Sequence, residues 1–361
     1  MPQLILVSNR LPVSIDADGT ATRTTGGLAS ALDGAGLTEN SIWVGWPGIA
    51  SEDITNPDTL RTTMRDVGTV AVLLSKDQLN GFYEGYSNST LWPLLHYMIE
   101  RARFDRSWAT SYRDVNQAFA DAVLTVARDG DTVWIHDYHL FLLPALLRTA
   151  GLHLRIGFFL HTPFPSSEIF RVLPERDAIV SGILGADLIG FHTSNYLRHF
   201  RSTVLRTLGI ESDVDTLHHG SRELRLGVYP IGHNRSGFEQ AMATDAFSAA
   251  LERYKPRLIN RCLILSVERL DYTKGVPQKL DAIREFLERH PDRRDKVTFI
   301  IIAVPSRQGV EEYDQLTDDV QREVGSINGT YGSVGHAPVQ FLHRSFPPAP
   351  MSASSLPSST A

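Results

Sequence analysis

Two cations, Arg269 and Lys274, lie near the end of the stretch Cys262–Gly275, which begins as an apolar run. A short apolar run that ends in turn residues predicts a buried strand leading into a loop, and ligands of open α/β sheets bind beyond the carboxyl ends of such strands. The planar fork of arginine and the point charge of lysine together suit a phosphate or pyrophosphate. The same pattern fits a surface ion-pair cluster with Glu268 and Asp271, so both interpretations stay open.

Acidic and imidazole side chains follow two earlier apolar runs. Asp137 comes directly after one run and His161 after the next, and neighbouring parallel strands would bring both to the same edge of a sheet. There they could hold sugar hydroxyls or share proton transfer. We expect His136 and His139 to be packed core histidines, whereas His161 is expected to be functional because it faces a loop stiffened by two prolines.

Aromatic, glycine and arginine residues offer further candidates. Tyr83 and Trp92 flank a polar stretch, where they suit a sugar phosphate or, equally, a packed core. The pair Gly26-Gly27 precedes an apolar helix; such a pair usually forms only a turn, and its functional form is a mobile loop whose amides approach a phosphate. Arg307 follows a further apolar run and could add a cation to a ligand cleft.

Several classes of site are excluded by the sequence patterns. The single cysteine, Cys262, lies in an apolar run, so it forms no intrachain disulfide and is expected to be a small core residue. The residues H-D-Y-H at 136–139 lack the spacing of a zinc-binding helix, so we expect no metal. Neither a P-loop pattern nor a strand-linked dinucleotide pattern occurs, so a nicotinamide enzyme is not expected, and no cofactor is expected.

The elements that must position these residues alternate between strands and helices. Apolar runs of strand length occur at 4–7, 42–44, 70–74, 132–135, 154–160, 188–190 and 225–229, and then at 263–267, 297–303 and 339–342. Helical patterns separate them, among them 79–86, 91–98, 115–126 and 238–254. This alternation predicts βαβ units and parallel sheets.

Two consecutive series of this kind predict an α/β protein with two Rossmann-like domains that face a ligand cleft, at residues 1–230 and 231–346. The segment Pro230-Ile231-Gly232 is the predicted hinge. The second domain has about three predicted strands, fewer than the roughly five or six of an average sheet, so we expect it to be incomplete. The Pro-, Ser- and Ala-rich segment 347–361 has no periodicity and is expected to be disordered.

The composition describes an ordinary soluble globular protein. Of the 361 residues, 42% are hydrophobic and 21% are charged. The net charge of −6 disfavours nucleic acid or a membrane surface as a partner. No stretch approaches the roughly 18 apolar residues of a membrane span, and the amino terminus has no signal-peptide pattern. We therefore expect a cytoplasmic protein.

Several separated blocks, in order, resemble the trehalose-6-phosphate synthases, which are retaining glycosyltransferases of the GT-B fold. The resemblance covers Leu4 to about Phe346. It rests on the blocks VSNRLPV, GGLASAL, WVGWPG, GFYEGYSNSTLWPLLHY, VWIHDYHLFLLPALLR, FFLHTPFPSSEIFRVLP, ADLIGFHTSNYLRHF, SVERLDYTKGVPQKL, IAVPSR and INGTYG. Glucosylglycerol-phosphate synthases share the DYTKG and HTPFP elements, but LWPLLHY and HDYHLFLLPALLR are more similar to the trehalose-phosphate branch.

The resemblance implies transfer of glucose from UDP-glucose to glucose 6-phosphate, giving trehalose 6-phosphate and UDP. Both substrates are therefore the expected partners, and a homo-oligomer is compatible with the sequence. The acceptor phosphate would be held by Arg10, Tyr83, Trp92 and Arg307. Gly26 and Gly27 would form a loop that closes over the donor, and Trp43 would line the same pocket.

The resemblance also implies roles at the reacting centre. Asp137 and His161 would contact the sugars, and Arg269 and Lys274 would neutralise the leaving UDP. This agrees with the chemistry, because cleavage of a bond to a diphosphate develops negative charge that fixed cations stabilise most in the transition state. In a retaining reaction with front-face attack, the leaving phosphate accepts the proton of the acceptor hydroxyl, so no enzymic nucleophile is needed. The resemblance also implies that no metal is needed to bind the diphosphate.

Two departures from the family pattern bear on activity. The family's I-G-[IV]-D-P is replaced by Ile231-Gly232-His233-Asn234-Arg235. The family also continues into a segment that reads roughly L-R-D-G-M-N-L-V and holds the donor, whereas the resemblance ends near Phe346. We therefore expect a C-terminally truncated member whose activity is weak or absent. The alternatives are a glucosylglycerol-phosphate synthase and a non-catalytic remnant that binds glucose 6-phosphate.

Overall fold

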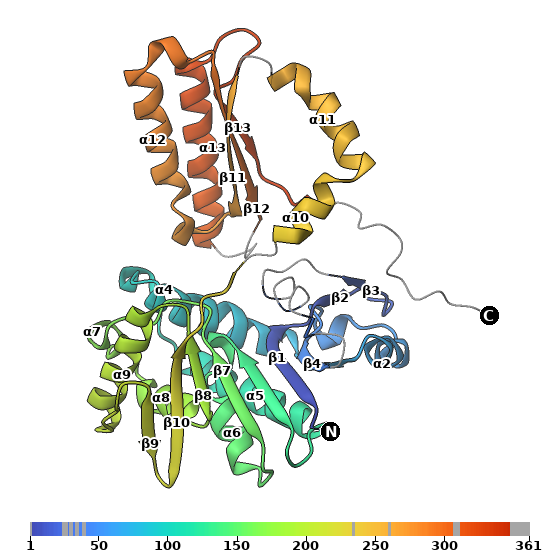
Figure 1. Cartoon of the computed structure of the whole chain (residues 1–361), viewed down its shortest axis with the longest axis vertical. Helices are drawn as coiled ribbons and strands as arrows, with labels where there is room; N and C mark the ends of the chain where they lie inside the picture. The colour runs from blue at the N-terminus through green and yellow to red at the C-terminus, as the bar shows by residue number, and fades with distance from the viewer. Residues whose placement is uncertain are drawn as a thin grey trace, which may run out of the picture. The chain divides into compact units, whose positions relative to one another are not determined.

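The computed structural model describes residues 2–23, 28, 32, 36–37, 41–232, 235–258, 261–305 and 311–346. The chain forms two compact units, Met1–His233 and Asn234–Ala361, which are named unit 1 and unit 2 (Figure 1). The division falls near the predicted boundary after residue 230. The assignment of the acceptor to the first domain and of the nucleotide sugar to the second stays a prediction. The predicted disordered tail at 347–361 and the departure at His233-Asn234 lie outside the described residues.

Unit 1 is built on an eight-stranded sheet in the order β5-β4-β1-β6-β7-β8-β10-β9. Its strands are β1 (Leu4–Arg10), β4 (Ser41–Trp46), β5 (Thr69–Ala71), β6 (Thr132–His136), β7 (Arg155–Phe159), β8 (Leu188–Phe191), β9 (Thr216–His219) and β10 (Arg222–Val228). All neighbours pair in parallel except β10 and β9, which are antiparallel. The order from β5 to β8 is that of a doubly wound fold, with the reversal of strand order between β1 and β6.

The middle of this sheet is apolar and inaccessible to solvent. Ile5, Leu6 and Val7 of β1 are fully buried, and β1 lies inside the sheet, with β4 paired to one of its edges and β6 to the other. Parallel strands that are covered on both faces typically appear in sequence as continuous apolar runs. A separate small hairpin pairs β2 (Val13–Ile15) with β3 (Ala21–Arg23).

Helices connect the strands of unit 1. They are α2 (Pro57–Asp66), α3 (Lys76–Gln78), α4 (Trp92–Leu95), α5 (Arg106–Leu124), α6 (Leu143–Thr149), α7 (Ser167–Phe170), α8 (Arg176–Ile183) and α9 (Ser194–Leu208). Local signals set their ends. The Asp105 carboxylate accepts a hydrogen bond from Ser107 N at 2.7 Å and caps α5, and α9 ends at Gly209, whose left-handed φ of 69° suits glycine.

A π-helix, η2 (Leu79–Leu91), runs directly into α4, where the sequence predicted two separate helices. Two glycines let it approach α5 closely. A β-carbon at Gly81 would lie 2.3 Å from Ser111 Oγ, and one at Gly85 would lie 2.6 Å from the Trp108 ring. The absence of a side chain at Gly81 and Gly85 therefore allows η2 to pack closely against α5.

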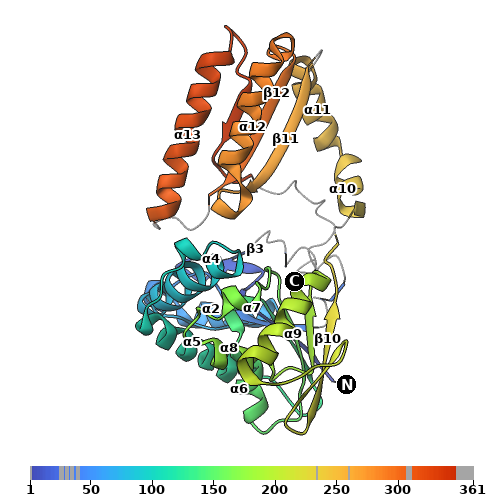
Figure 2. The same cartoon turned by 90° about the vertical axis from the view of Figure 1, so that its left-hand side faces the viewer.

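Unit 2 contains a three-stranded parallel sheet in the order β11-β12-β13. Its elements are α10 (Arg235–Met242), α11 (Asp245–Leu258), β11 (Cys262–Arg269), α12 (Val276–Arg289), β12 (Val297–Val304), α13 (Glu311–Tyr331) and β13 (Val339–Leu342). Helices α12 and α13 cover one face of the sheet, and α10 and α11 stand on the other side (Figure 2). No helix among the described residues of either unit is long and apolar enough to cross a membrane.

The single helix predicted at 238–254 is two helices in the structure. Thr244 separates them, because its Oγ1 accepts a hydrogen bond from Phe247 N at 3.2 Å and so caps the start of α11. Threonine is also a weak former of helix interiors, since its hydroxyl competes for backbone groups. The prediction was wrong at this point because apolar periodicity continues across the cap.

A second prediction, that the apolar run from Cys262 forms a buried strand, was wrong about burial. The strand, β11, forms as expected, but it lies at the edge of its sheet, and Leu265 and Val267 are 63% and 61% exposed. Cys262 is exposed as well, so the expectation of a core cysteine was wrong. The apolar run predicted a buried strand, yet burial requires neighbours, and only β12 pairs with β11 among the described residues.

Candidate active site

The carboxyl ends of β1 and β6 meet where the strand order of unit 1 reverses, which is where doubly wound folds bind ligands. Arg10 is the last residue of β1, and its guanidinium carbon lies 4.5 Å from the centroid of the Trp46 ring. Packing around this side chain lowers its pKa by desolvation, although the guanidinium stays charged. Gly48 has a φ of 92°, and a β-carbon there would lie 2.4 Å from the Arg10 guanidinium.

A second aromatic residue, Tyr83, lies beside Arg10 and Trp46, and these three residues are named the cationic corner. Tyr83, on η2, lies 5.9 Å from Trp46 between ring centroids and stacks on His139 at 5.9 Å. Tyr83 also acts electrostatically on Arg10, opposing the larger effect of desolvation on the arginine pKa. Two residues predicted to hold the acceptor phosphate, Arg10 and Tyr83, are thus brought together.

The two predicted tryptophans are buried. Trp43 is 4% exposed, and its Nε1 donates a hydrogen bond to Ser8 Oγ at 2.7 Å. Trp92 is 6% exposed, with its ring 4.1 Å from that of His96 and 5.7 Å from that of Tyr138. Their packing matches the core interpretation that was left open for Trp92, and their contacts with a ligand stay predictions.

Asp137 and His161 lie at the adjacent strand ends, as their positions in the sequence suggested. Asp137 N donates to Phe159 O at 2.8 Å, and the Asp137 carboxylate accepts a hydrogen bond from His161 N at 3.2 Å. Asp137 has a φ of 74°, which is uncommon for a residue other than glycine and costs roughly 1–3 kcal/mol. Such strain is typical of functional positions, and here it holds a half-buried carboxylate against the start of the next loop.

His161 is paired with a histidine that the sequence predicted to be core. His136 is 1% exposed, as expected, but its Nδ1 lies 3.1 Å from His161 Nε2. Burial lowers the pKa of His136 to about 3 and that of His161 to about 4, so both rings are neutral at pH 7. His192, after β8, has its ring centroid 5.7 Å from that of His161.

Sequence reasoning missed Trp46, Gly48 and His192. His192 carries the signal that pointed to His161, because it directly follows an apolar run of strand length. Gly48 could not be found from sequence, since the close approach of Arg10 depends on tertiary packing. Three predicted residues, Gly26, Gly27 and Arg307, lie outside the described residues.

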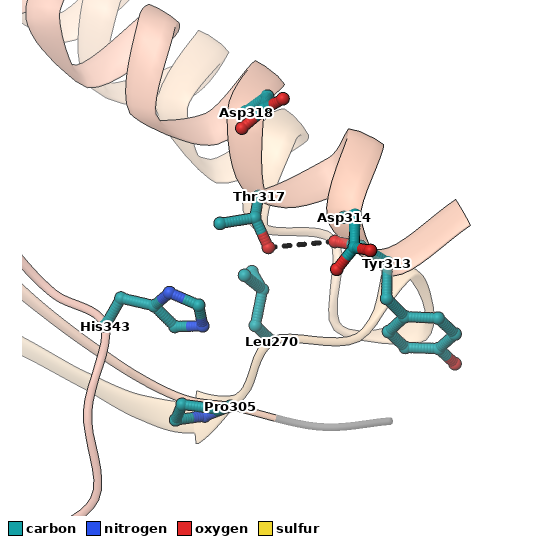
Figure 3. A pocket seen from close by; sticks show the side chains of 7 residues that line it. All are labelled: Leu270, Pro305, Tyr313, Asp314, Thr317, Asp318 and His343. Atoms are coloured by element: carbon teal, nitrogen blue, oxygen red, sulfur yellow. Dashed lines mark hydrogen bonds between the residues drawn. The ribbon is translucent and has the colours of Figure 1, made fainter. Parts of the chain in front are cut away.

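Unit 2 has a pocket of about 280 Å³ at the carboxyl edge of its sheet (Figure 3). Leu270, Pro305 and His343 line it, and each closely follows one of the three strands. The opposite wall comes from the first turns of α13, which contribute Tyr313, Asp314, Thr317 and Asp318. The position of this pocket beyond the ends of parallel strands is the usual ligand position of an open α/β sheet.

The predicted cations of unit 2 lie on the same edge. Arg269 ends β11, and Lys274 lies in the following 3-10 turn, η5 (Tyr272–Lys274); both are exposed. The turn is capped by Asp271, whose Oδ1 accepts from Thr273 N at 2.9 Å and whose Oδ2 accepts from the Tyr313 hydroxyl at 3.1 Å. The carboxylate of Glu268 pairs with Lys279 on α12.

A comparison with models of known protein families assigns this chain to a family. Glycosyltransferase family 20 matches residues 2–358. The chain belongs to this family. The match extends beyond Phe346, where the resemblance was expected to end.

Similar proteins of this family carry the name trehalose-phosphate synthase. An alpha,alpha-trehalose-phosphate synthase [UDP-forming] A from Dictyostelium discoideum is 41% identical over 355 residues, covering 97% of this chain and 48% of the relative. The chain therefore spans about half the length of that protein.

Solved structures of two similar proteins contain ligands. A Burkholderia xenovorans alpha,alpha-trehalose-phosphate synthase (UDP-forming) in complex with glucose-6-phosphate is 31% identical, with a TM-score of 0.83 and coverage of 95% of this chain and 75% of the other. A trehalose-6-phosphate structure from E. coli bound with UDP-2-fluoro glucose is 33% identical, with a TM-score of 0.83 and coverage of 96% and 74%. These likenesses confirm the predicted GT-B fold class.

Proposed function

We propose that this protein transfers glucose from UDP-glucose to glucose 6-phosphate with retention, forming trehalose 6-phosphate and UDP. The observation that carries the proposal is the cationic corner of Arg10, Trp46 and Tyr83 beside the Asp137–His161 pair, in a member of glycosyltransferase family 20. Similar proteins bound with glucose-6-phosphate and with UDP-2-fluoro glucose support both substrates.

In unit 1, Arg10 is proposed to bind the phosphate of the acceptor. A guanidinium donates two parallel hydrogen bonds to phosphate oxygens, and the Trp46 ring under it limits the orientations it can adopt. Tyr83 adds a hydroxyl beside an apolar ring, which suits a sugar phosphate. Asp137 and the neutral His161 are proposed to bind sugar hydroxyls, since a carboxylate accepts hydrogen bonds and a neutral imidazole can donate one.

In unit 2, Arg269 and Lys274 are proposed to bind the diphosphate of the donor. When the bond between glucose C1 and the diphosphate oxygen breaks, negative charge grows on that oxygen, and two fixed cations stabilise it most in the transition state. A new bond from the acceptor hydroxyl forms on the same face of C1. The proton of that hydroxyl passes to the leaving phosphate oxygen, so no side chain need act as a nucleophile.

The proposal is tested by incubating the purified chain with UDP-glucose and glucose 6-phosphate and measuring UDP release. UDP release above the background without protein, with a 1,1-linked product seen by NMR, is the expected result. A rate on the usual enzymatic scale, about 1–1000 per second, would show that the prediction of weak or absent activity is wrong. Lys274→Ala should lower this rate, while Lys255→Ala on α11 changes a surface lysine paired with Glu252 and should leave it unchanged.

Two ligand controls separate the proposal from its alternatives. If glycerol 3-phosphate is the faster acceptor, the protein is a glucosylglycerol-phosphate synthase. If calorimetry detects glucose 6-phosphate binding without turnover, this chain is a binding protein and the transferase proposal is wrong for it. Absence of both binding and turnover would contradict the proposal entirely.

A further inference from the structure

Three histidines lie at the carboxyl ends of consecutive strands of the unit 1 sheet. His136 ends β6, His161 follows β7 and His192 follows β8. Parallel pairing of these strands brings the rings into a row, with centroids 5.3 Å apart for His136 and His161 and 5.7 Å apart for His161 and His192. A hydrogen bond joins the first pair, in which His136 Nδ1 lies 3.1 Å from His161 Nε2.

One nitrogen of this pair must donate and the other must accept. Burial keeps both rings neutral near pH 7, because the pKa of His136 is lowered to about 3 and that of His161 to about 4. A neutral imidazole carries one N–H and one lone pair. The direction of the hydrogen bond therefore determines where the proton sits on both rings.

The burial of His136 favours one direction. Its side chain is 1% exposed, and its Nε2 has no hydrogen-bond partner within the part of the chain that the structure describes. If His161 donated, His136 would carry its own proton on Nε2 and bury an N–H group without an acceptor. If His136 donates, the buried atom is only a lone pair, and unfilled acceptors are found in protein interiors more often than orphaned donors.

We propose that His136 is a positioning residue whose Nδ1–H donates to His161 Nε2 and holds His161 as the tautomer that is protonated on Nδ1. This inference rests on the proposed function, in which His161 contacts a sugar. Sequence position alone cannot show it, because 25 residues separate the two histidines. The strand pairing that places His136 beside Phe159 brings them together.

The tautomer determines which ligand groups the site accepts. His161 Nδ1–H is a donor, and the neighbouring Asp137 carboxylate is an acceptor that already receives the His161 backbone N–H at 3.2 Å. A donor beside an acceptor suits a hydroxyl group, which accepts from one and donates to the other. The site is therefore built for a sugar hydroxyl, and it disfavours a ligand group that can only donate at the position facing His161.

The tautomer can be measured directly on the folded chain without substrate. The protein is labelled with ¹⁵N-histidine, and two-bond ¹⁵N–¹H correlation spectra are recorded at pH 7.5. The chain has 13 histidines, so the His161 signals are assigned by their loss in His161→Gln. The expected spectrum shows His161 protonated on Nδ1, and a His161 ring protonated on Nε2 overturns the proposal.

Two variants of His136 separate positioning from packing. In His136→Asn the side-chain amide can place an N–H near the former Nδ1, so the His161 tautomer should be kept. His136→Leu removes the donor, so His161 should shift toward the Nε2–H form. His192→Leu removes a neighbouring ring that makes no hydrogen bond to His161 among the described residues and should leave the His161 tautomer unchanged. Equal His161 spectra in all three variants would overturn the proposal.

Kinetics then link the tautomer to the reaction. His136→Leu should lower kcat/KM for UDP-glucose by about 5- to 10-fold, the scale of one neutral hydrogen bond, and His136→Asn should restore most of it. If His136→Leu does not fold, the native spectrum and the Asn variant still decide. A chain without turnover whose His161 is protonated on Nδ1 contradicts the proposed function but leaves the hydrogen-bond assignment standing.

Discussion

The first strands of the two units have nearly the same sequence and opposite surroundings. β1 reads LILVSNR and β11 reads CLILSVER, and both end in an arginine that is proposed to bind phosphate. Leu6 of β1 is fully buried, whereas Leu265, at the same place in the LIL segment, is 63% exposed. β1 has a paired strand on both edges, while β11 has one neighbour in a three-stranded sheet.

This difference shows that an apolar run predicts a strand without predicting its burial. The run favours extended structure through the properties of its own residues, but water is excluded by other segments. In unit 1 the chain returns to both sides of β1, with β4 and β6. In unit 2 the described residues supply β12 alone as a neighbour of β11.

The strongest test of this comparison is the same substitution in both strands. Leu6→Ala should cost about 2–5 kcal/mol of unfolding free energy, because it leaves a cavity in a packed core. Leu265→Ala should change the stability of unit 2 by less than about 0.5 kcal/mol, as for other exposed positions. Urea unfolding followed by tryptophan fluorescence reports unit 1, since all five tryptophans lie in it, and hydrogen exchange reports unit 2.

A large loss of stability in Leu265→Ala would break the comparison. It would mean that β11 is covered in solution, and size-exclusion chromatography with light scattering would then show whether a second copy of the chain covers it. A small effect in Leu6→Ala would contradict the description of β1 as a core strand.

Acid should destabilise unit 1 through its buried histidines. Burial lowers the pKa of His136 to about 3 and that of His161 to about 4, below the ordinary histidine value of 6.5. The unfolded chain therefore binds protons that the folded chain excludes, so this stability is present above about pH 6.5 and is lost as pH falls toward 4. At pH 5.5 the loss is about 1.4 kcal/mol for each histidine, or about 3 kcal/mol in total.

Urea titrations at pH 7.5 and 5.5, followed by tryptophan fluorescence, measure this effect. His136→Asn has one of the two buried histidines and should lose about half as much stability on acidification. An unfolding midpoint of unit 1 that does not change between the two pH values would show that these rings are hydrated in solution.

The smallest expected effect separates the ligands of the two arginines. Arg10→Gln should weaken glucose 6-phosphate binding about tenfold and leave UDP binding unchanged, because a charged hydrogen bond to phosphate is lost at one site only. Arg269→Gln should do the reverse. Calorimetry with each ligand checks both variants, and a variant that weakens both ligands equally would show that the two sites are not independent.

Much of the fold could be predicted from the sequence. The alternation of apolar runs and helical patterns predicted parallel α/β sheets, and Asp137 and His161 were placed at neighbouring strand ends, where the structure has them. The continuous helical segment of η2 and α4 was missed, because the polar residues 87–90 separate the two predicted helices, whereas Ser87, Asn88 and Thr90 are buried within η2. The cap at Thr244 was missed because apolar periodicity masked it.

The amino-acid sequence therefore specifies local features, namely which segments form strands and helices and which polar side chains follow each strand. Its motifs also identify the family. The burial of β1, the exposure of β11, the room that Gly48 leaves for Arg10 and the pairing of His136 with His161 arise from tertiary contacts. Burial, close approach and pairing depend on segments that are distant in the chain, and such contacts leave no local pattern from which they could be predicted.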